Sequence, residues 1–321
     1  MWWENQDKEL KTKVKELVKK GRLDLVSGGW SAPDEAVTTY DDILDNFMIG
    51  QTFLQKEFGI HPKVSWQLDA FGVSTAYARL ARDVGFDGMF FSRVDISEKK
   101  EMRKKHVTQQ IWRPHEENFG KQKDILAMTI DQGATLGAYC WPAGFWADTN
   151  YMVDAPIVLN KANPNYHFDK TVSGFYYGMV KQFENEKTNH AYRLFGCDMA
   201  FVDAKINYKI MDKLIETWDS LGFNEDIEIR YSTPSRYLSA ISKINKNEFK
   251  NETEVNFPVR HDDTFPYAQN PNQYWNGYYT SRPQLKSSIR KFGESLHSSL
   301  RLTSQQMLRR DRNESEIAEI L

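Results

Sequence analysis

Short apolar runs alternate with amphipathic segments along most of this chain, and this alternation constrains the fold more than any other feature. Strand-like runs are predicted at 23–26, 64–68, 88–91, 191–195 and 227–231. Helix-like segments, with apolar residues three or four positions apart, are predicted between them at 10–18, 40–58, 75–84 and 204–221. Strands that alternate with helices over short connections form a mainly parallel sheet covered by helices. We therefore predict an α/β fold.

The pattern changes near Arg282. From there, apolar residues recur at helical spacing with no intervening strand, at Leu285, Ile289, Phe292 and Leu296. We predict that residues 1–281 form an α/β domain and that residues 282–321 begin a separate helical element. The Asn- and Lys-rich stretch 243–254 is predicted to be an exposed loop.

Composition excludes several classes of protein. The charges of the 321 residues nearly cancel, with a formal net charge of −2, which argues against nucleic acid or an anionic membrane as the main partner. No apolar run approaches the roughly 20 residues that span a bilayer, and the amino-terminal residues enter a charged helix. Neither a membrane span nor a signal peptide is therefore predicted. The two cysteines, Cys140 and Cys197, are too few for a disulfide framework and leave the redox compartment open.

Polar side chains follow several of the predicted strands. Asp69, Arg93 and Asp198 each come shortly after a strand ends, and Asp148 lies in an aromatic loop that contains Gly and Pro. The carboxyl ends of parallel strands share one edge of a sheet, where α/β folds place their chemistry. We therefore expect these side chains to converge in one cleft.

Two carboxylates that face each other across a cleft can cleave a glycosidic bond, because one attacks the anomeric carbon while the other protonates the leaving oxygen. Asp69 would have to stay ionised in such a pair, and Asp198 would need a raised pKa to act as the acid. The simpler alternative is structural. Asp69 would then cap the helix that follows it, and the other polar residues would serve as caps, ion-pair partners or loop residues.

Five blocks of the sequence resemble motifs of the α-mannosidases of glycoside hydrolase family 38, in the family's order. The central block, Val64–Ser74, resembles Trp-x-x-Asp-Pro-Phe-Gly-His-Ser. Gly28–Ala36 is similar to Gly-Gly-Trp-x-x-x-Asp-Glu-Ala, and Gly85–Asp95 to Gly-Phe-Asp-Gly-x-Phe-Phe-x-Arg-x-Asp. Thr188–Asp198 is similar to the segment that ends Gly-Ser-Asp or Gly-Asp-Asp. The longest block, Phe265–Pro283, resembles Phe-Pro-Tyr-Ala followed by Tyr-Trp-x-Gly-Tyr-x-Thr-Ser-Arg-Pro.

The resemblance implies a role for each matched residue. Asp69 matches the family's nucleophile and zinc ligand, and Asp198 matches its proposed general acid/base. The residues that match the lining of the sugar site are Phe71, Arg93, Asp148 and Trp275.

The resemblance also implies a fold, a substrate and a location. The family removes α-linked mannose from oligosaccharides with retention, using a zinc ion that binds sugar hydroxyls. The implied fold is a seven-stranded β/α barrel-like catalytic domain, lacking here its amino-terminal strand, and 282–321 would be the first helix of the family's central helical bundle. The blocks look most similar to the lysosomal-type branch, which implies the lysosome, the vacuole or the secretory pathway.

The sequence departs from the family pattern around the candidate nucleophile. Ala70 replaces the usual Pro, Val73 replaces the usual His, and Gln67 stands where His is common. Met199 replaces the aromatic residue that follows the candidate acid. These changes lie next to the candidate nucleophile Asp69 and the candidate acid Asp198.

The family's other zinc ligands have no counterpart here. They are a His-x-Asp pair on the first strand and a His after the Thr-Ser-Arg-Pro motif. His167-Phe-Asp169 has the right spacing but lies in a polar loop, and His261-Asp262-Asp263 precedes Phe-Pro-Tyr-Ala, so neither fits. A catalytic zinc site needs about three protein ligands, so we interpret the chain as the middle of a catalytic domain.

Three interpretations follow. The first is an α-mannosidase represented by part of its catalytic domain. The second is a truncated, non-catalytic relative that binds mannosyl glycans weakly or is a decaying paralogue, which the substitutions around Asp69 favour somewhat. The third is a sugar deacetylase or another metal-dependent hydrolase, which would need a His-rich metal motif that the sequence lacks. A homo-oligomer stays open.

Overall fold

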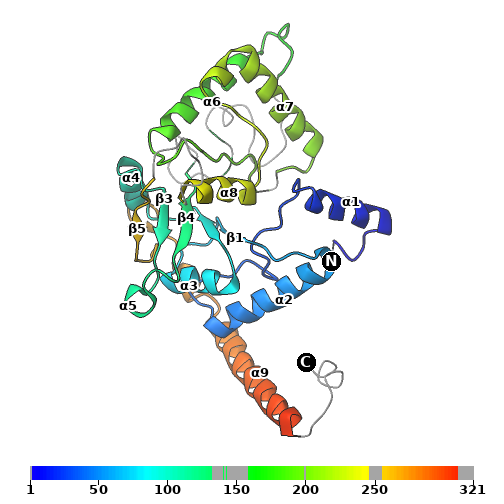
Figure 1. Ribbon diagram of the computed structural model, residues 1–321, viewed down its shortest axis with the longest axis vertical. Coiled ribbons are helices and arrows are strands. Elements are labelled where there is room, and N and C mark those ends of the chain that lie inside the picture. Colours follow the sequence, from blue (N-terminus) through cyan, green and yellow to red (C-terminus); the bar gives the residue numbers. More distant parts are fainter. Residues whose placement is uncertain are drawn as a thin grey trace.

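The chain forms a five-stranded sheet with helices on both faces (Figure 1). This computed structural model describes residues 2–131, 140, 142, 158–198, 200–245 and 255–309. The strands are β1 (Val64–Gln67), β2 (Gly88–Phe91), β3 (Gln109–Trp112), β4 (Ile125–Thr129) and β5 (Val259–Arg260), in the order β1-β2-β4-β3-β5. A separate hairpin consists of β6 (Ala268–Asn270) and β7 (Gln273–Tyr274).

Three of the four strand pairings in the five-stranded sheet of the described residues are parallel, as the sequence predicted. β1 pairs with β2, β2 with β4, and β3 with β5 in parallel, whereas β3 and β4 are antiparallel. The connection between β3 and β4 holds only the short helix α5 (Glu116–Phe119) and folds back without crossing the sheet, which a parallel pair would require. The carboxyl ends of β1, β2 and β4 therefore lie at one edge.

Apolar side chains on the two faces of the sheet form two separate cores. On one face, Met89 and Phe91 pack with Trp112 and with side chains of α2 (Tyr40–Phe58) and α3 (Thr75–Val84). On the other face, Phe90 packs with side chains of α8 (Pro234–Asn245). Figure 1 shows α3 and α8 on opposite sides of the strands. Because neighbouring strand residues point to opposite faces, the continuous apolar run of β2 fits burial on both.

The remaining helices lie around this centre. They are α1 (Lys8–Lys19), α4 (Ile96–Lys104), α6 (Phe168–Phe183), α7 (Ala204–Ser220) and α9 (Pro283–Arg309). α6 and α7 bury a third core of their own, which includes Phe168, Phe175 and Trp218. None of the helices in the described ranges is long and apolar enough to cross a bilayer.

Three of the predicted strands are not regular strands. Segment 23–26 has no strand conformation, although the amide of Ser27 donates to the carbonyl of Val64 at 2.7 Å, beside β1. Segments 191–195 and 227–231 contribute apolar side chains to the second and third cores without joining the sheet. The pattern of apolar residues therefore predicted correctly that these segments contribute side chains to a core. It could not predict whether they pair with another strand, because pairing depends on a neighbouring strand in register.

Continuous helix after Arg282 is confirmed as far as Arg309, whereas the domain division remains a prediction. α9 extends away from the sheet (Figure 1), and its apolar residues Leu285, Ile289 and Phe292 are exposed. The predicted loop 243–254 begins inside α8, and residues 246–254 lie outside the described part of the chain.

The Gly-Gly-Trp block owes its glycines to close packing against α2. The Trp30 amide donates to the Asn46 carbonyl at 2.9 Å. A Cβ on Gly50 would collide with the backbone of Gly28, Gly29 and Trp30. The loop and the helix therefore touch backbone to backbone, and this contact positions the chain that leads on to residues 33–36.

We expect Gly50→Ala to lower the free energy of unfolding by about 2 kcal/mol, because the added methyl group overpacks this contact. Helix propensity alone would favour alanine by roughly 1 kcal/mol. The sign of the change in the free energy of unfolding therefore shows whether packing or helix propensity dominates. Urea denaturation measures the change. Gly277→Ala is the matched control, because its added Cβ meets no described residue within 4 Å other than its chain neighbours. Equal or greater stability of Gly50→Ala would contradict the packing.

Candidate active site at the Asp69 turn

A tight turn presents Asp69 at the carboxyl end of β1. The Gly72 amide donates to the Ala70 carbonyl at 2.9 Å, and Gly72 has a φ of +106°, which favours glycine. A Cβ there would also collide with the ring of Phe265. The Asp69 side chain is 57% exposed, so its carboxylate faces solvent at the edge of the sheet.

Asp69 does not cap the next helix. The N-cap of α3 is Ser74, whose hydroxyl accepts from the Tyr77 amide at 2.9 Å. The structural alternative of Asp69 as a helix cap is therefore wrong. The tight turn at Gly72 separates the aspartate from the helix start.

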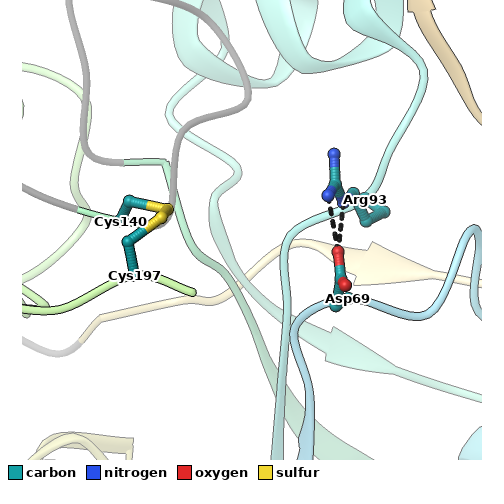
Figure 2. Close-up of a disulfide and its surroundings, with 4 residues drawn as sticks. All are labelled: Asp69, Arg93, Cys140 and Cys197. Carbon is teal, nitrogen blue, oxygen red and sulfur yellow. Dashed lines mark hydrogen bonds and ion pairs between the residues drawn. A yellow bond between two sulfur atoms is a disulfide. The ribbon is translucent and has the colours of Figure 1, made fainter. Parts of the chain in front are cut away.

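Arg93 holds one oxygen of Asp69. Its Nε and Nη2 atoms donate to Oδ1 of Asp69 at 2.8 and 2.5 Å (Figure 2). Both bonds end on the same atom, and Oδ2 receives no hydrogen bond from the described residues. The parallel pairing of β1 and β2 explains the contact, because each residue follows the end of its strand.

Aromatic rings enclose the guanidinium of Arg93. Its carbon lies 5.6, 5.4 and 5.1 Å from the ring centres of Phe71, Tyr267 and Trp275. Nη1 donates to the Tyr267 hydroxyl at 3.1 Å. Burial lowers the pKa of Arg93, but the hydrogen bonds to Tyr267 and Asp69 outweigh it, so the net pKa lies above the ordinary value. The guanidinium stays charged.

The exposed ring of Trp275 and the half-buried ring of Phe71 form an apolar surface beside Asp69. Phe71 and Trp275 meet edge to face, with ring centres 5.0 Å apart. Trp275 is 37% exposed, whereas Tyr267 is buried. Such rings can stack on the apolar face of a sugar. The structure thus brings together four of the predicted site residues: Asp69, Phe71, Arg93 and Trp275.

Of the other two predicted site residues, one lies outside the described residues and the other is not joined to this cluster. Asp148 lies outside the described residues. Asp198 is exposed, and its carboxylate makes no hydrogen bond or ion pair in the described part of the chain. Its neighbour Cys197 forms a disulfide with Cys140, a pairing that two cysteines 57 positions apart did not reveal. Figure 2 shows this disulfide and the Asp69–Arg93 pair in one view.

The described residues do not fit a complete zinc site. Within these ranges, no group of three His, Cys, Asp or Glu side chains could hold a metal ion. Asp69 is the matched ligand, and its Oδ1 atom already accepts two bonds from Arg93. One carboxylate falls short of the three or so protein ligands that a catalytic zinc requires.

Sequence reasoning missed Tyr267 and Glu35. Tyr267 lies in the Phe-Pro-Tyr-Ala block, and Glu35 lies in the Asp-Glu-Ala block. Both blocks resemble family motifs, but the resemblance alone does not say what either side chain contacts. Glu35 accepts from the Gln67 side chain at 3.0 Å and from the Ser74 amide at 2.6 Å. Desolvation by burial raises the pKa of Glu35 to about 8.

Comparisons with known proteins agree with the resemblance. Residues 1–270 match the family model described as the glycosyl hydrolases family 38 N-terminal domain. The chain is 34% identical over 288 residues to the lysosomal alpha-mannosidase of Cavia porcellus, covering 89% of this chain and 27% of that protein. It is 32% identical over 322 residues to that of Dictyostelium discoideum, covering 100% and 30%. The chain therefore spans less than a third of the length of these relatives.

A solved structure shares the fold. An alpha-mannosidase from Enterococcus faecalis V583 matches 80% of this chain and 24% of its own, with a TM-score of 0.54 and 17% sequence identity. This similarity supports the α/β architecture.

We expect Arg93→Met to lower the free energy of unfolding by about 1–2 kcal/mol, because it removes a mostly buried cation from its carboxylate and aromatic partners. Urea denaturation of both proteins measures the loss. Arg230→Met is the control, since Arg230 and its partner Glu228 are 71% and 73% exposed. Its loss should stay below about 0.5 kcal/mol. Equal losses would show that the enclosure of Arg93 contributes nothing.

Proposed function

This chain belongs to glycoside hydrolase family 38, and we propose that it supplies the nucleophile, the acid/base and sugar-binding side chains of an α-mannosidase catalytic domain. The observation that supports this best is the state of the Asp69 carboxylate. Arg93 orients it through Oδ1, and no described residue donates a hydrogen bond to Oδ2, which lies at the exposed edge of the sheet. A nucleophile needs this combination of a fixed orientation and one free oxygen.

The proposed reaction is hydrolysis of a terminal α-linked mannose with retention. Oδ2 of Asp69 would attack the anomeric carbon as its bond to the leaving oxygen breaks, and Asp198 would give that oxygen a proton. Water would then attack the mannosyl ester and lose a proton to Asp198, which regenerates the Asp69 carboxylate. The donors of Arg93 would keep Asp69 oriented through both steps.

The aromatic surface supports a sugar substrate. Trp275 and Phe71 present apolar area next to a carboxylate and a guanidinium, and pyranose rings have an apolar face and a polar rim. The implied substrate is a mannose-containing oligosaccharide of the N-glycan type. Asp148, which the resemblance also assigns to sugar binding, stays a prediction.

Zinc enters this proposal only through Asp69. The family resemblance implies a zinc ion that binds sugar hydroxyls, with Asp69 as one of its ligands. The described residues do not complete its site, and no step above passes through it.

The location and the domain division extend the proposal. The relatives named above are lysosomal alpha-mannosidases, and the Cys140–Cys197 disulfide suits an oxidising compartment. We infer a secretory route to a lysosome or vacuole. Residues 1–281 would belong to the catalytic domain, and 282–321 would begin the central helical bundle.

A non-catalytic, glycan-binding relative is the second candidate. The observation that favours it is the occupation of Oδ1 of Asp69 by Arg93, together with an incomplete set of zinc ligands among the described residues. Such a protein would keep the aromatic surface and lose the reaction.

Hydrolysis of an aryl α-mannoside, with and without added zinc, distinguishes the two candidates. We expect Asp69→Asn to lower kcat/KM by about a thousandfold, because the amide is a poor nucleophile. Asp219→Asn, an exposed aspartate on α7, is the control and should match the unchanged chain. Full activity of Asp69→Asn would contradict the role of Asp69. Mannoside binding without hydrolysis, lost in Trp275→Ala, would favour the non-catalytic relative.

A further inference from the structure

One carboxylate joins the two ends of the turn that carries Asp69. Oε1 of Glu35 accepts from Nε2 of Gln67 at 3.0 Å, and Oε2 accepts from the Ser74 amide at 2.6 Å. Gln67 is the last residue of β1, and Ser74 is the cap of α3. The segment 67–74 is thus closed at its base by a side chain that lies far from it in the sequence.

Both ends of the turn are themselves fixed. The Gln67 side chain is buried, and its Nε2 atom also donates to the Pro33 carbonyl at 3.0 Å. Within the turn, the Val73 amide donates to the Thr264 hydroxyl at 2.6 Å, and Val73 is fully buried. These bonds fix the base of the turn together with the two bonds that Glu35 accepts.

Glu35 also comes from a fixed part of the chain. It follows the Gly-Gly-Trp loop, which touches α2 backbone to backbone at Gly50, and the intervening Pro33 is buried. The contact therefore transmits the position of α2 to the Asp69 turn. The Asp-Glu-Ala block therefore stabilises the Asp69 turn as well as its own loop.

We propose that Glu35 is a positioning residue for Asp69: its carboxylate holds Gln67 and Ser74 together so that Asp69 stays against Arg93 with one oxygen open. The hydrogen bonds of Glu35 go to Gln67 and Ser74 and not to Asp69, so Glu35 acts through the turn. The inference rests on the proposed function only for its catalytic consequence, since the geometry of the turn can be measured without activity.

We call the two hydrogen bonds from Gln67 and Ser74 to the Glu35 carboxylate the clamp. The surroundings of Glu35 make the strength of this clamp depend on pH. The charged and titratable groups that face it are Asp34, beside it in the chain, and Tyr77 of α3, while its hydrogen-bond donors are neutral. Burial raises the pKa of Glu35 to about 8, so the carboxyl group is protonated below that pH and ionised above it. An ionised carboxylate is the stronger acceptor, so the clamp should tighten as the pH rises through 8.

Hydrogen exchange of the whole chain, read by mass spectrometry, tests the clamp directly. In Glu35→Gln one amide oxygen can still accept, but the amide nitrogen faces a donor, so one bond is lost. At about pH 9, where Glu35 is ionised, we expect protection of peptides that cover residues 67–74 to fall about tenfold, with peptides of β2 unchanged. Glu35→Asp should lower the protection of the same peptides by a smaller factor. Glu117 is an exposed glutamate on α5, and Glu117→Gln should leave the protection of residues 67–74 and of β2 unchanged.

The pH dependence of hydrogen exchange shows whether the Glu35 carboxylate positions the turn or only supports the domain as a whole. Protection of residues 67–74, corrected for intrinsic exchange, should rise between pH 7 and about 9 in the unchanged chain and stay flat in Glu35→Gln. If the chain hydrolyses a mannoside, kcat measured above pH 8 should fall about tenfold in Glu35→Gln with little change in KM.

The outcomes are distinct. Unchanged protection of residues 67–74 in Glu35→Gln at about pH 9 would overturn the clamp, whatever the activity. Loss of protection throughout the sheet in both Glu35 variants would also overturn it, because Glu35 would then support the whole domain. Local loss in a chain with no hydrolysis would support the clamp while the proposed reaction fails.

Discussion

The candidate site depends on the parallel pairing of β1 with β2. This pairing brings the ends of two strands to one edge of the sheet, so that Asp69 and Arg93 meet although they are separated by helix α3. The aromatic residues Phe71, Tyr267 and Trp275 then enclose the mostly buried guanidinium, and its hydrogen bonds to Tyr267 and Asp69 keep it charged. Without this pairing, neither the orientation of the carboxylate nor the aromatic surface beside it would exist.

The backbone of the turn carries the second constraint. A strand that ends in an exposed carboxylate must reverse into a helix within a few residues, and Gly72 makes this possible with a positive φ. Thr264 and Glu35 hold the reversed chain from two sides. The family's usual His at position 73 is a fully buried valine here, so the turn is held by packing and by hydrogen bonds to its backbone.

The sequence predicted the parts of this arrangement that depend on local pattern. Apolar periodicity located α2, α3, α7 and the strands β1 and β2, but not β3, β4 or β5. The position of Asp69 and Arg93 after the ends of β1 and β2 correctly predicted that the two side chains lie close together. Tyr267 and Glu35 could not be derived in this way, because their partners lie far away in the sequence and their roles depend on tertiary contacts. The same reason explains the three segments that have strand-like composition but no strand partner, and the unexpected disulfide beside Asp198.

The central claim is that Asp69 is a nucleophile held ready by its turn and by Arg93. A mannose-configured, mechanism-based inactivator that traps a glycosyl ester tests it most directly, with the labelled peptide located by mass spectrometry. Retaining glycosidases form such an ester on the attacking carboxylate. We expect the label on Asp69 and none in Asp69→Asn. A label on another carboxylate, or hydrolysis that proceeds without any label on Asp69, would contradict the account.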